Sequence, residues 1–251
     1  MNDKTSVLRE TDDEARKLAR TLLRSARYAA LAVLDPETGF PSASRVLIGT
    51  DIDCVPVVLV SGLSAHTKAL LADARSSLLA GEPGKGDPLA HPRLTVQCLA
   101  ERIDRESALH ARIRERFLNR HPKAGLYIDF PDFCFFRLVP QSASLNGGFG
   151  RAYVLPGSDL VIPSALSQFV AARAADAVRE LVGRHPDIAD VLAKKLRQEK
   201  GKDWAISGLD AEGLDLISAD VLLRFEFEPR IQEGCDIASH ISKIAYSIPE
   251  I

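Results

Sequence analysis

The sequence predicts an α+β fold: a six-stranded antiparallel β-barrel with an N-terminal helix, followed by a small α+β C-terminal domain. Three observations support this prediction. Six runs with strand character fall between residues 27 and 139, with short helices or turns between them. Several runs alternate apolar and polar residues, as the walls of small barrels do. A stretch rich in Pro, Gly and Ser up to Pro163 then precedes a second group of helices and strands.

Length and composition place few limits on function. A chain of 251 residues with 46% hydrophobic and 26% charged residues is typical of globular proteins with one large or two ordinary domains. A formal net charge of -2 provides no long-range attraction to nucleic acid or anionic lipid. The acidic N-terminus does not resemble a signal peptide, and no apolar run is long enough to span a membrane. We therefore expect a cytoplasmic protein that binds neither nucleic acid nor a membrane.

The four cysteines, Cys54, Cys98, Cys134 and Cys235, are scattered and form no CxxC pair. Three of them lie in apolar runs, which favours buried thiols in a reducing compartment over disulfides or a zinc site. No metal site is expected.

The first part of the chain predicts a helix followed by three strands. Thr11 opens the segment TDDE, a capping box that closes on Glu14 ahead of apolar residues at helical spacing. Residues 35–39 form a turn after the first strand. The predicted strands cover residues 27–34, 42–48 and 56–60.

The rest of the barrel region alternates short helices and strands. Ser64 caps a short helix over 65–73, and a charged amphipathic helix covers 106–117. Residues 81–92 carry Gly, Pro and Asp and predict a long loop. The remaining strands cover residues 76–79, 94–103 and 132–139, and the last of these ends at Pro140.

Beyond a linker that ends at Pro163, the pattern predicts a smaller α+β unit. Helices are expected over 165–182, 187–199 and 236–246, and strands within 204–227 around a turn at 210–213. Trp204 is expected to anchor the core of this unit. The predicted domains are residues 1–155 and 163–251.

The most informative segment for function is Ser61–Lys68, where an apolar strand enters the start of a helix. Free backbone N–H groups at a helix N-terminus, with hydroxyls and a lysine beside them, form a site for anions. A phosphorylated cofactor would suit such a site. On these residues alone, an ordinary capped helix with a solvated lysine is the alternative.

Several ordered segments resemble a known family. They are PSASR (41–45), LSAHTK (63–68), GDPLAHPR (86–93), RFLNRHPKA (116–124), DF (132–133) and GGFGRA (147–152). Together they resemble the split-barrel domain related to pyridoxamine 5′-phosphate oxidase, in its haem-utilisation subgroup. The segment GLDAEGLDL (208–216) resembles a small domain that accompanies this barrel.

The resemblance implies a homodimer with cofactor sites between the subunits. In flavin-binding members, the FMN phosphate is held by the second and third strands and the following helix. The corresponding residues here are Ser44, Arg45, Ser61, His66, Thr67 and Lys68. The oxidase pattern places an arginine where Ser44 stands, and because strand side chains alternate between faces, Arg45 points away from the site unless a bulge reorients it.

A second set of expected cofactor residues lies in the glycine-rich segment. Gly148 lets a loop approach a planar ligand, Phe149 stacks on a flavin or tetrapyrrole, and Arg151 pairs with a phosphate or propionate. Haem-degrading relatives use a histidine a few tens of residues beyond this segment as the iron ligand. Residues 151–184 contain no histidine, and neither His185 nor His240 matches a ligand motif.

Three functions follow from the resemblance. The preferred one is a dimeric FMN-binding oxidoreductase of unknown substrate, because the helix-start anion site is present and the haem ligand is absent. The alternatives are a haem-binding or haem-degrading protein, and a non-enzymatic regulator of tetrapyrrole metabolism. True pyridoxamine phosphate oxidase activity is not expected, because that enzyme's C-terminal signature is missing. The sequence also lacks a nucleophile elbow, a nucleotide-binding glycine loop and zinc spacing.

Overall fold

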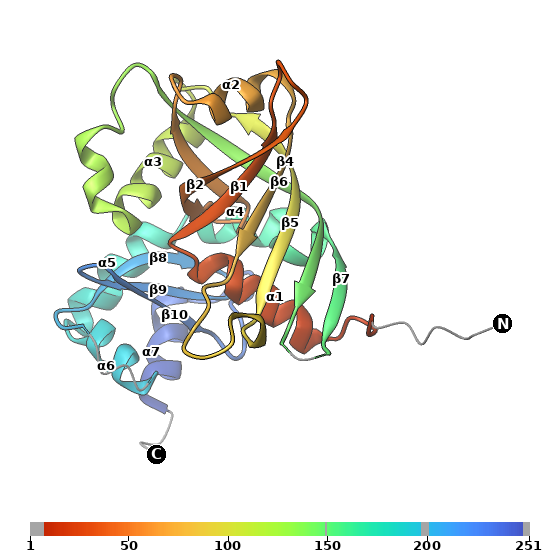
Figure 1. Cartoon of the computed structure of the whole chain (residues 1–251). Helices are drawn as coiled ribbons and strands as arrows, with labels where there is room; N and C mark the ends of the chain where they lie inside the picture. The colour runs from red at the N-terminus through yellow and green to blue at the C-terminus, as the bar shows by residue number, and fades with distance from the viewer. Residues whose placement is uncertain (1–7, 149, 197–200, 248–251) are drawn as a thin grey trace. The chain divides into compact units, whose positions relative to one another are not determined.

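The computed structural model describes residues 8–148, 150–196 and 201–247, so the predicted site residue Phe149 lies outside the described residues. The chain divides into two compact units. The first contains residues 1–51, 55–118 and 123–161, and the second contains residues 52–54, 119–122 and 162–251. Figure 1 traces the chain through both.

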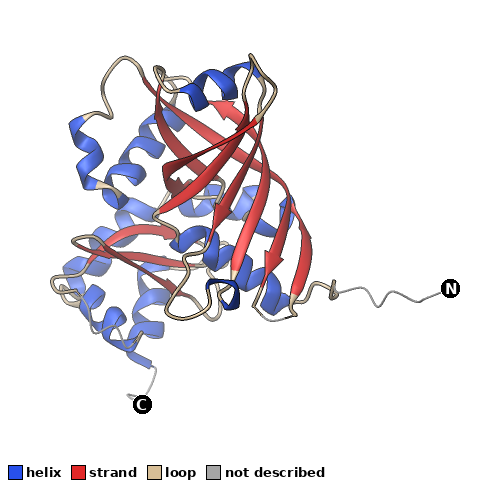
Figure 2. Ribbon diagram, viewed as in Figure 1, coloured by secondary structure: helices blue, strands red, loops and turns tan. Residues whose placement is uncertain are grey.

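The first unit is a closed antiparallel barrel, which confirms the predicted fold class (Figure 2). Its sheet has the order β3-β2-β1-β4-β5-β6-β7, and an additional β3–β6 pairing closes the six-stranded ring. Its strands are β1 (Tyr28–Leu34), β2 (Pro41–Thr50), β3 (Pro56–Ser61), β4 (Arg75–Ala80), β5 (Arg93–Arg102), β6 (Phe133–Asn146) and β7 (Ala152–Pro156). Its helices are α1 (Asp13–Ser25), α2 (Ala65–Ala72) and α3 (Ala108–Arg120), with short 3-10 turns η1 (Pro88–Ala90), η2 (Pro122–Leu126) and η3 (Gly157–Leu160).

Alternation along the strands builds the barrel core. In β1, buried Ala29, Leu31 and Val33 alternate with more exposed neighbours, and β5 repeats the pattern through Leu94, Val96 and Cys98. Full burial of one such leucine or valine stabilises the fold by about 1.5–3 kcal/mol. The inner face of each strand therefore closes the barrel around one apolar cluster.

Three predicted boundaries in this unit are wrong. The strand expected to end at Pro140 continues to Asn146, because Pro140 lies opposite Cys98 at a bulge where its missing N–H is tolerated. The expected linker contains β7, since Gly147 N–H donates to Arg151 O (2.7 Å) and turns the chain back onto β6. The N-cap of α1 is Asp12, which accepts from Ala15 N–H (2.7 Å), whereas Thr11 Oγ1 donates to the carbonyl of Val154.

The second unit contains the helices α4 (Ser164–Ala171), α5 (Ala174–Arg184), α6 (Ile188–Lys195) and α7 (Ile237–Ser247), and the strands β8 (Ala205–Asp210), β9 (Gly213–Ser218) and β10 (Val221–Glu226). The strands form a separate sheet of order β10-β9-β8. Trp204 is 9% exposed within the apolar cluster of this unit, as predicted. The single helix expected over 165–182 is two helices separated by a turn at 172–173, where Arg173 donates to the Phe169 carbonyl and lies over the Phe169 ring (4.4 Å).

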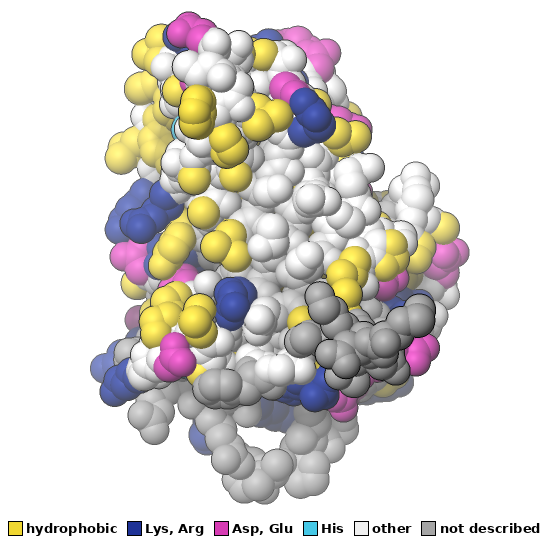
Figure 3. Space-filling model, turned by 45° about the vertical axis from the view of Figure 1, so that its right-hand side comes forward, with side chains coloured by type: hydrophobic (Ala, Val, Ile, Leu, Met, Phe, Trp, Pro, Cys, Tyr) yellow, Lys and Arg dark blue, Asp and Glu magenta, His cyan; other side chains and the backbone are white. Residues whose placement is uncertain are grey.

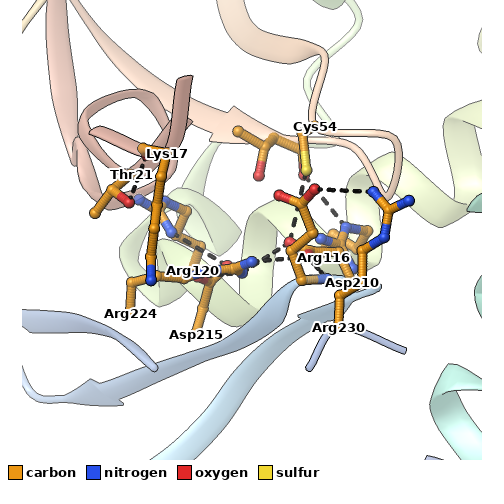
Figure 4. A network of polar contacts seen from close by, with 11 residues as sticks. Lys17, Thr21, Cys54, Arg116, Arg120, Asp210, Asp215, Arg224 and Arg230 are labelled. Atoms are coloured by element: carbon orange, nitrogen blue, oxygen red, sulfur yellow. Dashed lines mark hydrogen bonds and ion pairs between the residues drawn. The ribbon is translucent and has the colours of Figure 1, made fainter. Parts of the chain in front are cut away.

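A network of buried charged residues lies in the second unit (Figure 4). Arg224 donates to both carboxylate oxygens of Asp210 (2.7 Å each) and to Asp215 Oδ1 (3.2 Å). The Cys54 thiol donates to Asp210 Oδ2 (3.6 Å), and Arg120 pairs with Asp215 (3.6 Å). We name these five residues the arginine network. Cys54 follows the turn at 52–53 with left-handed backbone (φ 67°) and lies before β3.

Two glycines of the GLDAEGLDL segment make room for the arginine network. A Cβ at Gly213 would lie 2.3 Å from Phe225 O and 2.9 Å from Arg224 Nε, and a Cβ at Gly208 would lie 2.8 Å from Asp215 Oδ2. The segment therefore supplies both the carboxylates and the space that the guanidinium requires.

Candidate functional site

The segment between β3 and α2 holds the predicted anion site, and its N–H groups are largely used within the fold. Ser64 precedes α2 with extended backbone, but its side chain makes no capping hydrogen bond, contrary to prediction. The backbone N–H groups of residues 62, 63 and 64 donate to Asp132 O (2.6 Å), Ser61 Oγ (3.2 Å) and Ser61 O (3.0 Å). These donors are therefore not directed at an external anion.

The two predicted hydroxyl ligands also have partners in the protein. Ser61 Oγ donates to Asp132 Oδ2 (2.6 Å), and Thr67 Oγ1 donates to the Ser61 carbonyl (2.7 Å). Thr67 is 1% exposed. Asp132 was not predicted as a partner of Ser61, because the two residues meet only through the β3–β6 pairing.

Ser44 and His66 do come together, from β2 and α2. Ser44 Oγ lies 3.2 Å from His66 Nδ1. Burial lowers the pKa of the half-buried His66, so its imidazole is neutral near pH 7. Among the described residues, no hydrogen bond to His66 Nε2 is present. We name Ser44, His66, Ser61 and Asp132 the α2 cluster.

The neighbouring cations lie on the surface. Arg45 is exposed, and its guanidinium lies 5.3 Å from the centroid of the Tyr28 ring. Strand alternation therefore directs Ser44 toward His66 and Arg45 elsewhere. Lys68 is exposed on α2.

The glycine-rich segment lies at the other end of the barrel. Ser61 pairs with Phe133 at the start of β6, and Asn146, before the Gly147–Arg151 turn, ends the same 14-residue strand (Figure 1). At about 3.3 Å per residue, the two ends are roughly 40 Å apart along the strand. Within one chain, the two groups of predicted cofactor residues thus do not form one site.

The contacts of the glycine-rich turn are internal. Gly148 has a φ of 85°, and a Cβ there would lie 2.6 Å from Ala90 O, so this turn requires glycine. Arg151 donates to the Gly147 carbonyl (2.8 Å).

Two pockets of the first unit were not predicted. One, about 520 Å³, lies along β1, β4 and β5 and includes the buried Ser76, whose hydroxyl has no hydrogen-bond partner among the described residues. The other, about 490 Å³, lies where β5 ends and β6 begins and includes His110 and Cys134. The second pocket was not predicted because its lining residue His110 belongs to residues 106–117, which have the charge pattern of a helix face in contact with solvent.

No family model matches the sequence. The chain is 32% identical over 139 residues to the chloroplastic heme oxygenase HOZ of Arabidopsis thaliana, covering 55% of this chain and 42% of that protein. It is 31% identical over 110 residues to the heme oxygenase HutZ of Vibrio cholerae, covering 41% of this chain and 61% of that protein. The chain thus spans less than two thirds of the length of these curated relatives.

Two solved structures match nearly the whole chain. A protein of unknown function from Agrobacterium tumefaciens is 30% identical with a TM-score of 0.79, covering 93% of this chain and 96% of that one. A heme-binding protein from Mycobacterium smegmatis is 28% identical with a TM-score of 0.56, covering 95% and 98%. This chain belongs to the split-barrel family related to pyridoxamine 5′-phosphate oxidase, in its haem-utilisation subgroup.

His185 and His240, the two C-terminal histidines, both contact other residues of the fold. His185 ends α5 through its N–H bond to Leu181 O, and its ring lies 4.9 Å from that of Tyr246. His240 Nε2 is 2.9 Å from the Pro229 carbonyl oxygen. In the described part of the chain, no group of three metal-ligating side chains is present, and no helix is long and apolar enough to cross a membrane.

Proposed function

We propose that this split-barrel protein binds haem. The observation that carries the proposal is the similarity along 95% of the chain to the heme-binding protein of Mycobacterium smegmatis. The names of both curated relatives point to the same ligand.

The α2 cluster offers an iron ligand of suitable chemistry. Histidines that bind metals present one ring nitrogen to the metal while a polar group orients the ring through the other. His66 has this arrangement, with Nδ1 beside Ser44 Oγ and a neutral ring. Bound haem would supply a redox-active iron and a visible chromophore.

The neighbouring charges suit the propionates of haem. Lys68 lies two residues after His66 on α2, and Arg45 follows Ser44 on β2, so each points away from its neighbour and could approach the ligand only through its long, flexible side chain. Both side chains are exposed and can move to meet a carboxylate. In this role they neutralise and orient the ligand.

The same geometry weighs against FMN in the predicted phosphate site. Ser61 and Thr67 hydroxyls donate within the fold, and the Asp132 carboxylate next to Ser61 would repel a phosphate. An FMN-dependent oxidoreductase and a non-enzymatic regulator remain the alternative functions. The cytoplasmic location stays a prediction.

We also infer that two copies of the chain associate through the outer face of the large sheet. The outward positions along β1, β4, β5 and β7 carry no charge in mid-strand, and the exposed apolar side chains among them are Tyr28, Leu79, Leu99 and Val154. In Figure 3 the side of the molecule that is turned forward bears few charged side chains over its middle. Uncharged surfaces of this kind are typical of protein interfaces.

Titration of the purified protein with hemin, followed by absorption in the Soret region, tests the proposal. We expect saturable binding, and His66→Ala should weaken it and change the spectrum. Ser44→Ala should weaken it about tenfold, as losses of orienting groups do at metal sites. His91→Ala is the matched control, since His91 Nε2 already contacts the Lys85 carbonyl oxygen (3.0 Å).

The results separate the alternatives. No binding by the unaltered protein contradicts the haem proposal, and binding that His66→Ala leaves intact contradicts only the assigned ligand. A flavin spectrum that stays with the protein after excess FMN is removed by gel filtration, without haem binding, favours the oxidoreductase interpretation. Loss of the Soret band on adding a reductant in air supports haem degradation; a stable spectrum supports binding alone.

A further inference from the structure

The pocket between the ends of β5 and β6 has a composition that the haem proposal does not use. We name it the β5–β6 pocket; its lining residues are Arg102, Ile103, Asp104, Arg105, His110, Pro131, Phe133 and Cys134. It lies wholly in the first unit and encloses about 490 Å³. Pockets of roughly 300–1,000 Å³ hold small organic ligands in proteins.

One side of the β5–β6 pocket is apolar and firmly packed. Phe133 lies 4.9 Å from the Tyr127 ring and 6.3 Å from the Phe130 ring, measured between centroids. Ile103 is buried, and its N–H donates to Phe135 O (2.9 Å). These side chains provide a fixed surface against which a flat ligand can pack.

The other side carries two guanidinium groups. Arg105 is held in place by donating to the carbonyls of Phe130 (2.7 Å) and Phe133 (3.0 Å). Arg102 is exposed at the end of β5 and lies beside the Cys134 thiol; burial raises the pKa of that thiol, and Arg102 opposes the rise. Asp104 is the acid of the lining, and its Oδ1 already accepts from Glu106 N–H (3.1 Å). The charge balance of the pocket is positive.

His110 adds a neutral hydrogen-bonding group. Its ring meets the edge of Phe135 with centroids 5.4 Å apart, and no hydrogen bond to its ring nitrogens is present among the described residues. The pKa of His110 is lowered, mainly by burial and to a smaller extent by the charges of Arg105 and Arg114. Asp129 and Glu106 act in the opposite direction but do not cancel this effect. Near pH 7 the ring therefore offers one N–H donor and one acceptor.

We propose that the β5–β6 pocket binds a small planar organic carboxylate, with the carboxylate on Arg102 and the flat body against Phe133 and Ile103. A guanidinium can donate to both oxygens of a carboxylate at once, which favours this group over a neutral polar one. The apolar side favours a ring over a bare inorganic anion. The lining includes no residue of the α2 cluster, although Asp132 lies between Pro131 and Phe133, and the inference does not rest on haem binding.

Protection of Cys134 from iodoacetamide tests the proposal directly, with benzoate as the probe. Cys134 and Cys235 are both half-buried free thiols, so Cys235 is an internal control outside the pocket. We expect benzoate to slow alkylation of Cys134 in a saturable manner and leave Cys235 unchanged, as read by peptide mass spectrometry. Acetate, which lacks the ring, and benzyl alcohol, which lacks the charge, should leave both rates unchanged.

A pair of arginine variants on the same strand locates the carboxylate. Arg102→Leu should raise the benzoate concentration needed for protection about tenfold or more, as loss of a charge-assisted hydrogen bond does. Arg93→Leu, at the other end of β5, should leave it unchanged. The rates with and without benzoate are compared within each variant, because Arg102 also affects the reactivity of Cys134.

Two outcomes would overturn the proposal. One is an unchanged Cys134 rate in benzoate, and the other is equal protection by benzoate, acetate and benzyl alcohol. If benzoate fails but hemin protects Cys134, the arginine is assigned to a haem propionate instead of a separate small acid.

Discussion

The arginine network predicts a large and local effect on stability. Asp210→Asn removes one of two carboxylates facing Arg224 with almost no change in volume. The Asp210 and Arg224 side chains are 1% and 2% exposed, so water cannot replace the lost charge. The buried Arg224 guanidinium would then lose one of its two neighbouring carboxylates and keep Asp215, which also pairs with Arg120.

The magnitude follows from the cost of breaking a buried ion pair. Removal of one partner typically costs about 3–5 kcal/mol, and we expect about 3 kcal/mol because the amide oxygen can still accept one hydrogen bond. Burial acts to lower the pKa of Arg224, but Asp210 and Asp215 hold it above its ordinary value, so the arginine stays charged. For a protein of this size, 3 kcal/mol corresponds to a melting temperature lower by about 6–12 °C.

Urea denaturation followed by Trp204 fluorescence measures this effect. Trp204 is the only tryptophan and lies in the same unit as the arginine network. Asp176→Asn is the matched control, because the Asp176–Arg179 pair is exposed on α5 and should contribute less than about 1 kcal/mol. A free energy of unfolding for Asp210→Asn within about 1 kcal/mol of the unaltered protein would refute the reasoning.

Two further predictions concern packing and pH. Gly213→Ala should destabilise the second unit by about 1–3 kcal/mol in the same assay, because its Cβ would meet Phe225 O at 2.3 Å. Gly183→Ala, in helix α5 with open space around it, should be neutral or slightly stabilising; equal losses for both would contradict the packing argument. Burial lowers the pKa of His66 in the folded protein, so as the pH falls His66 is protonated in the unfolded chain before it is protonated in the folded one. The contribution of His66 to the free energy of unfolding is therefore complete above the ordinary histidine pKa and declines as the pH falls below it. Hemin affinity should likewise stay constant near neutral pH and fall on acidification through the lowered pKa, and His66→Ala should remove that dependence.

The barrel could be predicted because its signal is local. Alternation in β1 and β5 is visible in the residues themselves, since each strand has one face in the core. The errors arose where a distant partner decided the outcome. The strand continues through Pro140 only because its pairing with β5 has a bulge at Cys98. Thr11 does not cap α1 because its hydroxyl donates to the carbonyl of Val154.

The candidate site was predictable only in part, for the same reason. Alternation restricted the choice to Ser44 or Arg45, and the contact with His66 selects Ser44. The partner of Ser61, by contrast, is Asp132, which only strand pairing brings near. The packing of His110 was not predicted from the charged helix that contains it, because the ring that it contacts, Phe135, belongs to β6.

Strand β6 also bears on how the chain reaches its folded state. It borders β5 along most of its length, β3 with its first residues and β7 with its last. Until Phe133–Arg137 has emerged from the ribosome, the apolar strand β3 has an open edge that could pair with another nascent chain. Chaperone occupancy on translating ribosomes should therefore rise after β3 is exposed and fall once β6 has been synthesised.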